Sequence, residues 1–124
     1  MKGLGVDVVD LERFAGVLDR RPSICGRLFT DAEQSYCDLA AAATKRAERY
    51  AGRFAAKEAV HKVLAAGIGA FRWHDVEVAR AESGEPSLVL RGAASELAAA
   101  REITHWHVSI THDRLVAVAV VVGE

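Results

Sequence analysis

Two acidic residues stand where the surrounding pattern calls for apolar side chains, and the first of them is Asp7. It lies in segment 4–9, whose alternation is typical of a β-strand. Asp7 shares one strand face with Gly3, Gly5 and Val9. Glycines on a strand face let a ligand or another backbone approach closely. Asp7 is therefore either a ligand carboxylate or, alternatively, a helix cap or turn acceptor.

The second carboxylate, Glu58, lies on a long helix expected over residues 45–66, with Thr44 as its N-cap and Gly67 just beyond its end. At about 100° per residue, Glu58 and Lys62 fall inside the apolar stripe of this helix. An ionised carboxylate there costs several kcal/mol unless it is compensated. Either Glu58 and Lys62 pair with each other at i,i+4 spacing, or Glu58 binds a divalent cation and Lys62 an anion. The apolar stripe consists of Ala47, Ala51, Phe54, Ala55 and Ala59.

If the side chains of Asp7 and Glu58 lie close together in the fold, they can form a magnesium site. Two carboxylates supply the hard oxygen ligands that Mg²⁺ prefers, and water and phosphate complete its coordination. Cations on the same helix would then suit a polyphosphate. These cations are Arg53, Lys57, His61 and Lys62. Beside the apolar stripe the helix has a separate basic stripe, formed by Arg46, Arg49, Arg53, Lys57 and His61.

A third polar group lies on a strand expected over residues 105–111. His107 and Ser109 share one face of this strand with His105 and Thr111, while the other face is apolar. Four polar side chains on one strand face form either a solvated surface or one wall of a phosphate-binding cleft.

These residues belong to a chain that we interpret as a single α+β domain over residues 1–124, with helices in the first half and strands in the second. Asp10 is expected to cap the first helix, and Thr30 with Glu33 forms a capping-box pattern. The expected helices cover 11–18, 31–40, 45–66 and 93–101, with a short helical piece after Pro22. The expected strands cover 4–9, 73–80, 87–90, 105–111 and 115–122, the last two forming an antiparallel hairpin.

The composition excludes several classes of protein. The net charge is −1, from 16 Lys and Arg against 17 Asp and Glu, so no overall field attracts nucleic acid or a membrane surface. No apolar run approaches the ~20 residues of a membrane span, and no basic leader precedes an apolar segment. We therefore expect a cytoplasmic protein that binds neither membranes nor nucleic acid.

Six segments together resemble the holo-acyl-carrier-protein synthase family, the small AcpS-type 4′-phosphopantetheinyl transferases. They occur in the order and spacing of that family and cover essentially the whole chain. The RFAAKEA segment together with the early Asp is highly specific, whereas residues 40–50 are the least family-like. The six segments are GLGVDVVDLERF at 3–14, LFTDAE at 28–33, RFAAKEAVHKVL at 53–64, WHDVEV at 73–78, GEP at 84–86 and HVSITHD at 107–113.

The resemblance implies an AcpS-like fold in which the long central helix packs on a small antiparallel sheet. It implies a homotrimer with clefts between subunits, in accord with the apolar run at 116–122, whose exposed face would need a partner. The implied reaction transfers the 4′-phosphopantetheine group from coenzyme A to a serine of an apo acyl carrier protein. It requires Mg²⁺, releases adenosine 3′,5′-bisphosphate and serves fatty acid biosynthesis.

The resemblance also assigns residues to roles. Asp7 and Glu58 match the Mg²⁺ ligands, and Lys62 matches a phosphate contact that also offers a proton to the leaving group. The serine is deprotonated by Glu58, by a metal-held water or by a carboxylate of the carrier. The implied coenzyme A contacts are Arg53, Lys62, Gly84, Pro86, His107 and Ser109. The implied carrier-docking residues are Arg13, Arg20, Arg21 and Arg27, which alternatively are ordinary solvated arginines.

Two other functions compete with this one. A different Mg²⁺ enzyme, such as a nucleotide pyrophosphohydrolase, could use the same carboxylates, and it would consume coenzyme A without any carrier protein. A non-catalytic module could bind coenzyme A or a carrier without turnover. The presence of Asp7, Glu58 and Lys62 together argues against such a module, because binding alone does not require a costly carboxylate on an apolar face.

Overall fold

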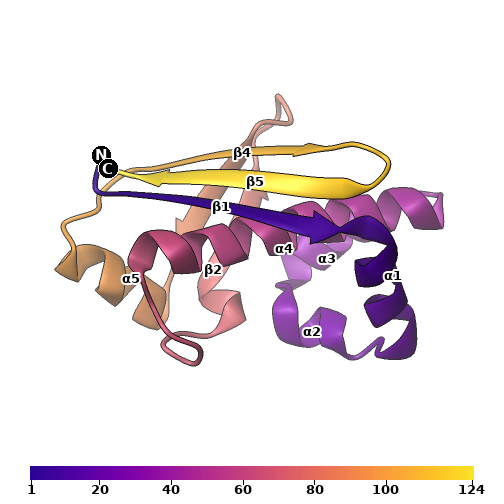
Figure 1. Cartoon of the computed structure of the whole chain (residues 1–124), viewed down its shortest axis with the longest axis horizontal. Helices are drawn as coiled ribbons and strands as arrows, with labels where there is room; N and C mark the ends of the chain where they lie inside the picture. The colour runs from indigo at the N-terminus through magenta and orange to yellow at the C-terminus, as the bar shows by residue number, and fades with distance from the viewer.

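A three-stranded antiparallel sheet lies along one long helix, and this pair of layers forms the centre of the computed structural model, which covers residues 1–124 (Figure 1). The sheet has the strand order β1-β5-β4, and β2 pairs with β3 in a separate hairpin. The α+β architecture and the terminal antiparallel hairpin are confirmed. The helices are α1 (Leu11–Arg20), α2 (Ile24–Leu28), α3 (Asp31–Asp38), α4 (Ala43–Leu64) and α5 (Gly92–Ala100). The strands are β1 (Gly3–Asp10), β2 (Val76–Arg80), β3 (Pro86–Leu90), β4 (Trp106–His112) and β5 (Val116–Gly123).

The two faces of the sheet differ sharply in what covers them. On the inner face, which packs on α4, Asp7 is in register with Ala119 of β5, and Ala119 with Ile110 of β4. On the outer face, Val6 is in register with Val120, and Val120 with Ser109. No helix of the chain covers this outer face (Figure 1). None of the helices combines the length and the apolarity needed to span a membrane.

The inner face of β1 approaches α4 at backbone distance. A Cβ atom on Gly5 would lie 2.1 Å from the carbonyl oxygen of Ala59, and one on Gly3 would lie 2.8 Å from a methyl group of Val63. Neither position has room for a larger side chain, so the glycines of this strand allow the helix to lie directly on it.

A fully buried ion pair joins α4 to α3. Lys57 Nζ lies 2.8 Å from a carboxylate oxygen of Glu33, and it donates hydrogen bonds to the carbonyls of Trp73 (3.0 Å) and Val76 (2.6 Å). Burial lowers the pKa of Lys57, while the Glu33 carboxylate opposes that shift. The expectation that Lys57 contacts a polyphosphate is wrong, because α3 and β2 cover this part of the basic stripe.

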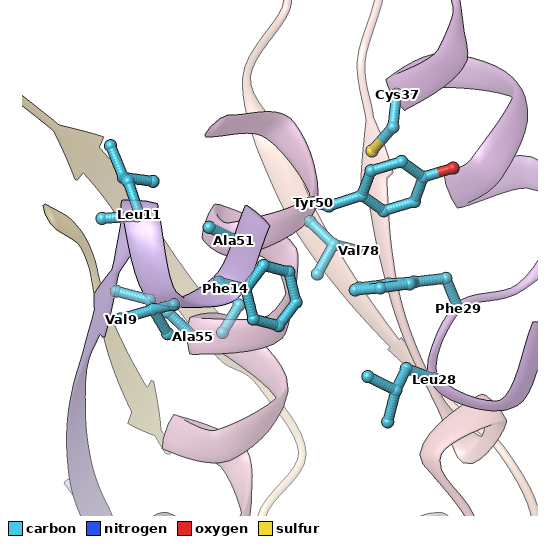
Figure 2. Close-up of a cluster of buried hydrophobic side chains, with 13 residues drawn as sticks. Val9, Leu11, Phe14, Leu28, Phe29, Cys37, Tyr50, Ala51, Ala55 and Val78 are labelled. Atoms are coloured by element: carbon cyan, nitrogen blue, oxygen red, sulfur yellow. The ribbon is translucent and has the colours of Figure 1, made fainter. Parts of the chain in front are cut away.

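Two hydrophobic clusters flank this helix. Figure 2 shows the larger cluster, in which Phe14 of α1 lies on one side of α4 and Phe29 with Tyr50 on the other. Ala51 and Ala55 of α4 belong to the same cluster and are fully buried. The small side chains of these alanines let other elements pack closely against α4.

The ends of α4 differ from those expected. Ala42, not Thr44, holds the N-cap position, and the Arg46 guanidinium fixes the entering chain by donating to the carbonyls of residues 40 and 41. At the other end Ala65, not Gly67, adopts the left-handed conformation, with φ 50° and ψ 37°. The N–H of Ala65 donates to the carbonyls of His61 and Lys62. The left-handed backbone at Ala65 therefore ends the helix two residues before Gly67. The expected strand at 73–80 begins only at Val76, because residues 73–75 form a 3₁₀ turn.

The close approach of β1 to α4 predicts that Gly5→Ala destabilises the protein. The added methyl group meets the backbone of α4, which cannot rotate away, and overpacking of this kind costs roughly 1–3 kcal/mol. Urea denaturation of the variant and of Gly67→Ala, whose Cβ would meet nothing within 4 Å, provides the matched comparison. Equal free energies of unfolding for the two variants would show that the strand and helix have room to separate.

Candidate active site

Asp7 and Glu58 line the same cavity, which has a volume of about 400 Å³ and lies between β1, α1 and α4. Asp7 comes from the inner face of β1, two residues beyond the close contact at Gly5, and Glu58 immediately precedes Ala59 on α4. Phe14 and Phe54 form an apolar wall of the cavity, and their rings stack at 5.2 Å. The structure therefore brings together the two carboxylates that the sequence singled out.

Lys62 joins this pair through Asp7. Its ammonium group donates a hydrogen bond of 2.7 Å to the carbonyl of Val6 and lies 3.3 Å from a carboxylate oxygen of Asp7. The side chain is 54% exposed, so an incoming anion can reach it. The alternative i,i+4 pair with Glu58 does not form, and Glu58 makes no ion pair.

Glu58 places a second carboxylate, without an ion-pair partner, beside Asp7. Partial burial raises the pKa of Glu58, and the nearby charge of Asp7 raises it further, while His61 and Lys62 act in the opposite direction. A carboxylate whose charged form is disfavoured by burial and by a neighbouring carboxylate favours the binding of a cation. The chain has no cluster of three or more His, Cys, Asp or Glu able to hold a metal ion alone. An ion held by this pair would take its other ligands from water and substrate, which is the mode that Mg²⁺ prefers.

Arg53, a second predicted site residue, lies in a different place. Arg53 precedes Glu58 by five residues on α4, so the two side chains are separated by about 140° around the helix axis. Its side chain is 7% exposed and its guanidinium lies 4.2 Å from the centre of the Tyr36 ring. Arg80 stacks on the same ring at 4.1 Å, and a Cβ on Gly84 would lie 3.0 Å from Arg80. Arg53 and the turn at 84–86 therefore share one neighbourhood, away from the carboxylates.

His107 and Ser109 lie on the outer face of the sheet. Ser109 is in register with Val120 and, through it, with Val6, whereas Asp7 belongs to the inner face. The His107 ring nitrogen Nε2 lies 3.3 Å from a carboxylate oxygen of Glu124, and both side chains are exposed. Within one chain these two residues do not reach the cavity of Asp7 and Glu58.

The predicted docking arginines follow α1. Arg13 lines the same cavity as the two carboxylates, and its backbone N–H donates to the Asp10 side chain that caps the helix. Arg20 and Arg13 line an adjoining hollow on the exposed side of α1. Arg21 and Arg27 are also exposed, beyond the end of that helix. This rim along α1 therefore carries both signs of charge, because Asp10 and Glu12 line the adjoining hollow beside the two arginines.

Sequence reasoning missed the part that Tyr36 plays beside Arg53. Tyr36 lies on α3, Arg49 and Arg53 lie on α4, and Arg80 ends β2, and all three guanidinium groups lie within 4.1–4.3 Å of the ring centre. No local pattern reveals a contact among three separate elements. The only hint was the basic stripe that carries Arg49 and Arg53.

Comparison with known proteins identifies the class to which this architecture belongs. Residues 3–120 match the family model of the 4′-phosphopantetheinyl transferase superfamily. The chain is 52% identical over 122 residues to a holo-[acyl-carrier-protein] synthase of Frankia alni, covering 98% of this chain and 96% of that one. It is 45% identical over 122 residues to the enzyme of the same name from Beutenbergia cavernae, covering 98% and 97%.

Solved structures agree in fold over nearly the full length. A holo-(acyl-carrier-protein) synthase from Bacillus anthracis in complex with CoA (3′,5′-ADP) superposes with a TM-score of 0.81 at 32% identity, covering 98% of this chain and 95% of that one. The Helicobacter pylori enzyme in complex with coenzyme A gives 0.84 at 28% identity, covering 98% and 99%. The fold and site thus define a 4′-phosphopantetheinyl transferase, and within that superfamily the chain belongs to the holo-[acyl-carrier-protein] synthase family. The resemblance stated from the sequence is confirmed.

Proposed function

We propose that Asp7 and Glu58 hold the Mg²⁺ with which this holo-[acyl-carrier-protein] synthase transfers 4′-phosphopantetheine from coenzyme A to a serine of an apo acyl carrier protein. One observation carries the proposal: carboxylates from β1 and α4 line one cavity in a chain of this family. The solved relatives described as complexes with coenzyme A support the same donor. A cytoplasmic location accords with this role in fatty acid biosynthesis.

In the reaction, the serine oxygen attacks the phosphorus that bears the pantetheine arm, and the bond to the other phosphate of the coenzyme A pyrophosphate breaks. Adenosine 3′,5′-bisphosphate leaves. The bound ion supplies neutralisation of charge on the pyrophosphate oxygens. Lys62, fixed by the Val6 carbonyl and by Asp7 but exposed at its tip, contacts a phosphate oxygen and offers a proton to the leaving bisphosphate.

A homotrimer completes the coenzyme A site in this proposal. The outer face of the sheet exposes a continuous row of apolar side chains, with exposed fractions of 58% for Leu4, 49% for Val6, 59% for Val8 and 38% for Val120. Apolar faces of this kind mark contact surfaces. A neighbouring copy that covers this face can also bring His107 and Ser109, which lie on it, to the edge of a cleft. Arg53 and the turn from Gly84 to Pro86 would contact the nucleotide end of coenzyme A.

The carrier protein docks along α1 in this proposal. Carrier proteins are acidic, and Arg13 lies at the rim of the cavity that holds the carboxylates. Arg20, Arg21 and Arg27 are further exposed arginines at and beyond the end of α1, and as exposed charges they would speed association more than they deepen affinity.

Mass spectrometry of apo acyl carrier protein incubated with coenzyme A and Mg²⁺ tests the function, with an added phosphopantetheine as the expected product.

Glu58→Gln keeps the shape of the side chain but removes its charge, so we expect transfer to fall by roughly 100-fold or more. The control is Glu96→Gln, which changes an exposed carboxylate on α5. Transfer near the wild-type rate by folded Glu58→Gln would disprove the metal assignment. Consumption of coenzyme A without carrier would indicate a pyrophosphohydrolase instead.

Light scattering tests the assembly, with the mass of three chains expected for the wild type at micromolar concentration. Val120→Lys places a charge at the middle of the apolar outer face, so it should dissociate the trimer and abolish transfer. Ser95→Lys, on the exposed side of α5, should do neither. A fully active monomer would refute the proposal that two subunits together form the coenzyme A site.

Arg13→Ala should raise the KM for the carrier and weaken its dependence on salt, while the KM for coenzyme A stays nearly constant. A docked, charge-assisted hydrogen bond contributes roughly 1.5–3 kcal/mol, against ~0.2–1 kcal/mol for an exposed pair, so the size of the effect separates the two roles. Steady-state kinetics with each substrate varied in turn provides the measurement. A lower affinity for coenzyme A with an unchanged carrier KM would make Arg13 a nucleotide contact.

A further inference from the structure

A second cavity, separate from that of the two carboxylates, lies between α2 and the 3₁₀ turn at 73–75. It has a volume of about 370 Å³, and no acidic residue lines it. Arg27 comes from α2, whereas Arg72 and His74 come from the turn and the residue before it. Both arginines are exposed, and neither forms an ion pair. The cavity is therefore a cationic site whose charges have no partner within the chain.

A hydrogen bond fixes the two walls of this cavity relative to each other. His74 Nε2 lies 2.7 Å from the carbonyl oxygen of Gly26, and because a carbonyl can only accept, Nε2 carries the proton. Arg27 follows Gly26 directly, and Arg72 precedes His74 by two residues. Asp75 does not line the cavity, since its carboxylate accepts from the Arg72 backbone N–H at 3.1 Å and lies beside the first residue of α5. The contact thus holds two exposed guanidinium groups on either side of one cavity.

A row of aromatic rings connects this cavity with the candidate active site. Phe14 and Phe54 line the cavity of the carboxylates, and the ring of Phe54 lies 5.4 Å from that of Trp73 in the wall of the second cavity. Phe54 and Trp73 are only partly buried, so the row has an accessible apolar side. In the fold, α1 and α2 lie at the same end of the molecule (Figure 1). The second cavity therefore adjoins the surface along which we propose that the carrier docks.

The charge of the second cavity suits an acidic protein surface. The hollow beside Arg13 and Arg20 also contains Asp10 and Glu12, so its charges partly cancel. The second cavity instead combines two arginines with an indole ring and contains no acid. An acidic helix that reaches it meets no like charge in its wall, and opposite charges at such a surface select the partner and its orientation.

We propose that Arg72 binds an acidic side chain of the carrier protein and, together with Arg27, extends the docking surface from α1 onto the 3₁₀ turn. The inference rests on the proposed function for the identity of the partner. Because the two arginines come from separate elements fixed to each other, the enzyme favours carriers that present a carboxylate at this distance from the reacting serine. Arg72 is thus a residue that determines carrier specificity through binding and takes no part in the chemical step.

Steady-state kinetics with the apo acyl carrier protein varied at saturating coenzyme A tests the role of Arg72. Arg72→Glu reverses the charge and should raise the KM for the carrier by roughly tenfold, and Arg72→Ala should raise it by roughly threefold, with a weaker dependence on salt in both. Arg72→Lys keeps the charge and should stay within about twofold of the wild type. The kcat and the KM for coenzyme A should stay constant in all three. The control is Lys2→Ala, which removes an exposed cation paired with Glu102 and should leave the carrier KM unchanged.

An unchanged carrier KM in Arg72→Glu would overturn the proposal. A raised KM for coenzyme A with a constant carrier KM would also overturn it, because Arg72 would then contact the donor. Calorimetric titration with apo carrier in the absence of coenzyme A separates docking from the reaction, and the wild type should bind more tightly than Arg72→Glu. If no transfer occurs but this difference in affinity is present, the proposed reaction is wrong and the docking site stands. Transfer by the wild type together with equal affinities of the two proteins for the carrier would reject the docking site alone.

Discussion

The backbone contact between Gly5 and the carbonyl of Ala59 sets the distance between β1 and α4, and the candidate site depends on that distance. A side chain at Gly5 has no room, since its Cβ would lie 2.1 Å from the Ala59 oxygen. Asp7 follows Gly5 on the same strand face, and Glu58 is the neighbour of Ala59. The same close packing that joins sheet to helix therefore places two carboxylates beside one cavity. The geometry of the charged groups follows from the smallest side chains in the chain.

Lys57 and Glu58 are neighbours on α4, but only the first has its charge paired within the fold. Lys57 is fully buried, paired with Glu33 and bonded to two carbonyls, so its charge is satisfied within the fold. Glu58, the next residue, has no partner of its own and faces the charge of Asp7, which helps to raise its pKa. Removing one member of a buried pair leaves an unpaired charge and is strongly destabilising, so neither Lys57 nor Glu33 is available to a ligand. Glu58 has no ion-pair partner and Asp7 pairs only with the half-exposed Lys62, so these two carboxylates are the ones suited to a ligand.

The features that could be predicted from the sequence are those that depend on residues close together in the chain. The glycines beside Asp7, the capping box of Thr30 and Glu33, and the terminal hairpin are all read from residues close together in the chain, and the structure contains each of them. The burial of Lys57 could not be predicted, because a helical wheel does not show that α3 and β2 cover the basic stripe. The ring of Tyr36 with its three arginines joins three elements and left no local pattern. The outer placement of His107 and Ser109 depends on strand order, which periodicity along one strand does not fix.

The central claim is that Asp7 and Glu58 of one chain share a metal ion. Anomalous diffraction from crystals of the protein grown with Mn²⁺ in place of Mg²⁺, and with coenzyme A, tests it most directly. The account predicts a single strong peak with a carboxylate oxygen from each residue at roughly 2 Å, the coordination distance of such ions, and pyrophosphate oxygens on the opposite side. A peak bound by only one of the two carboxylates, or located away from both, would contradict it.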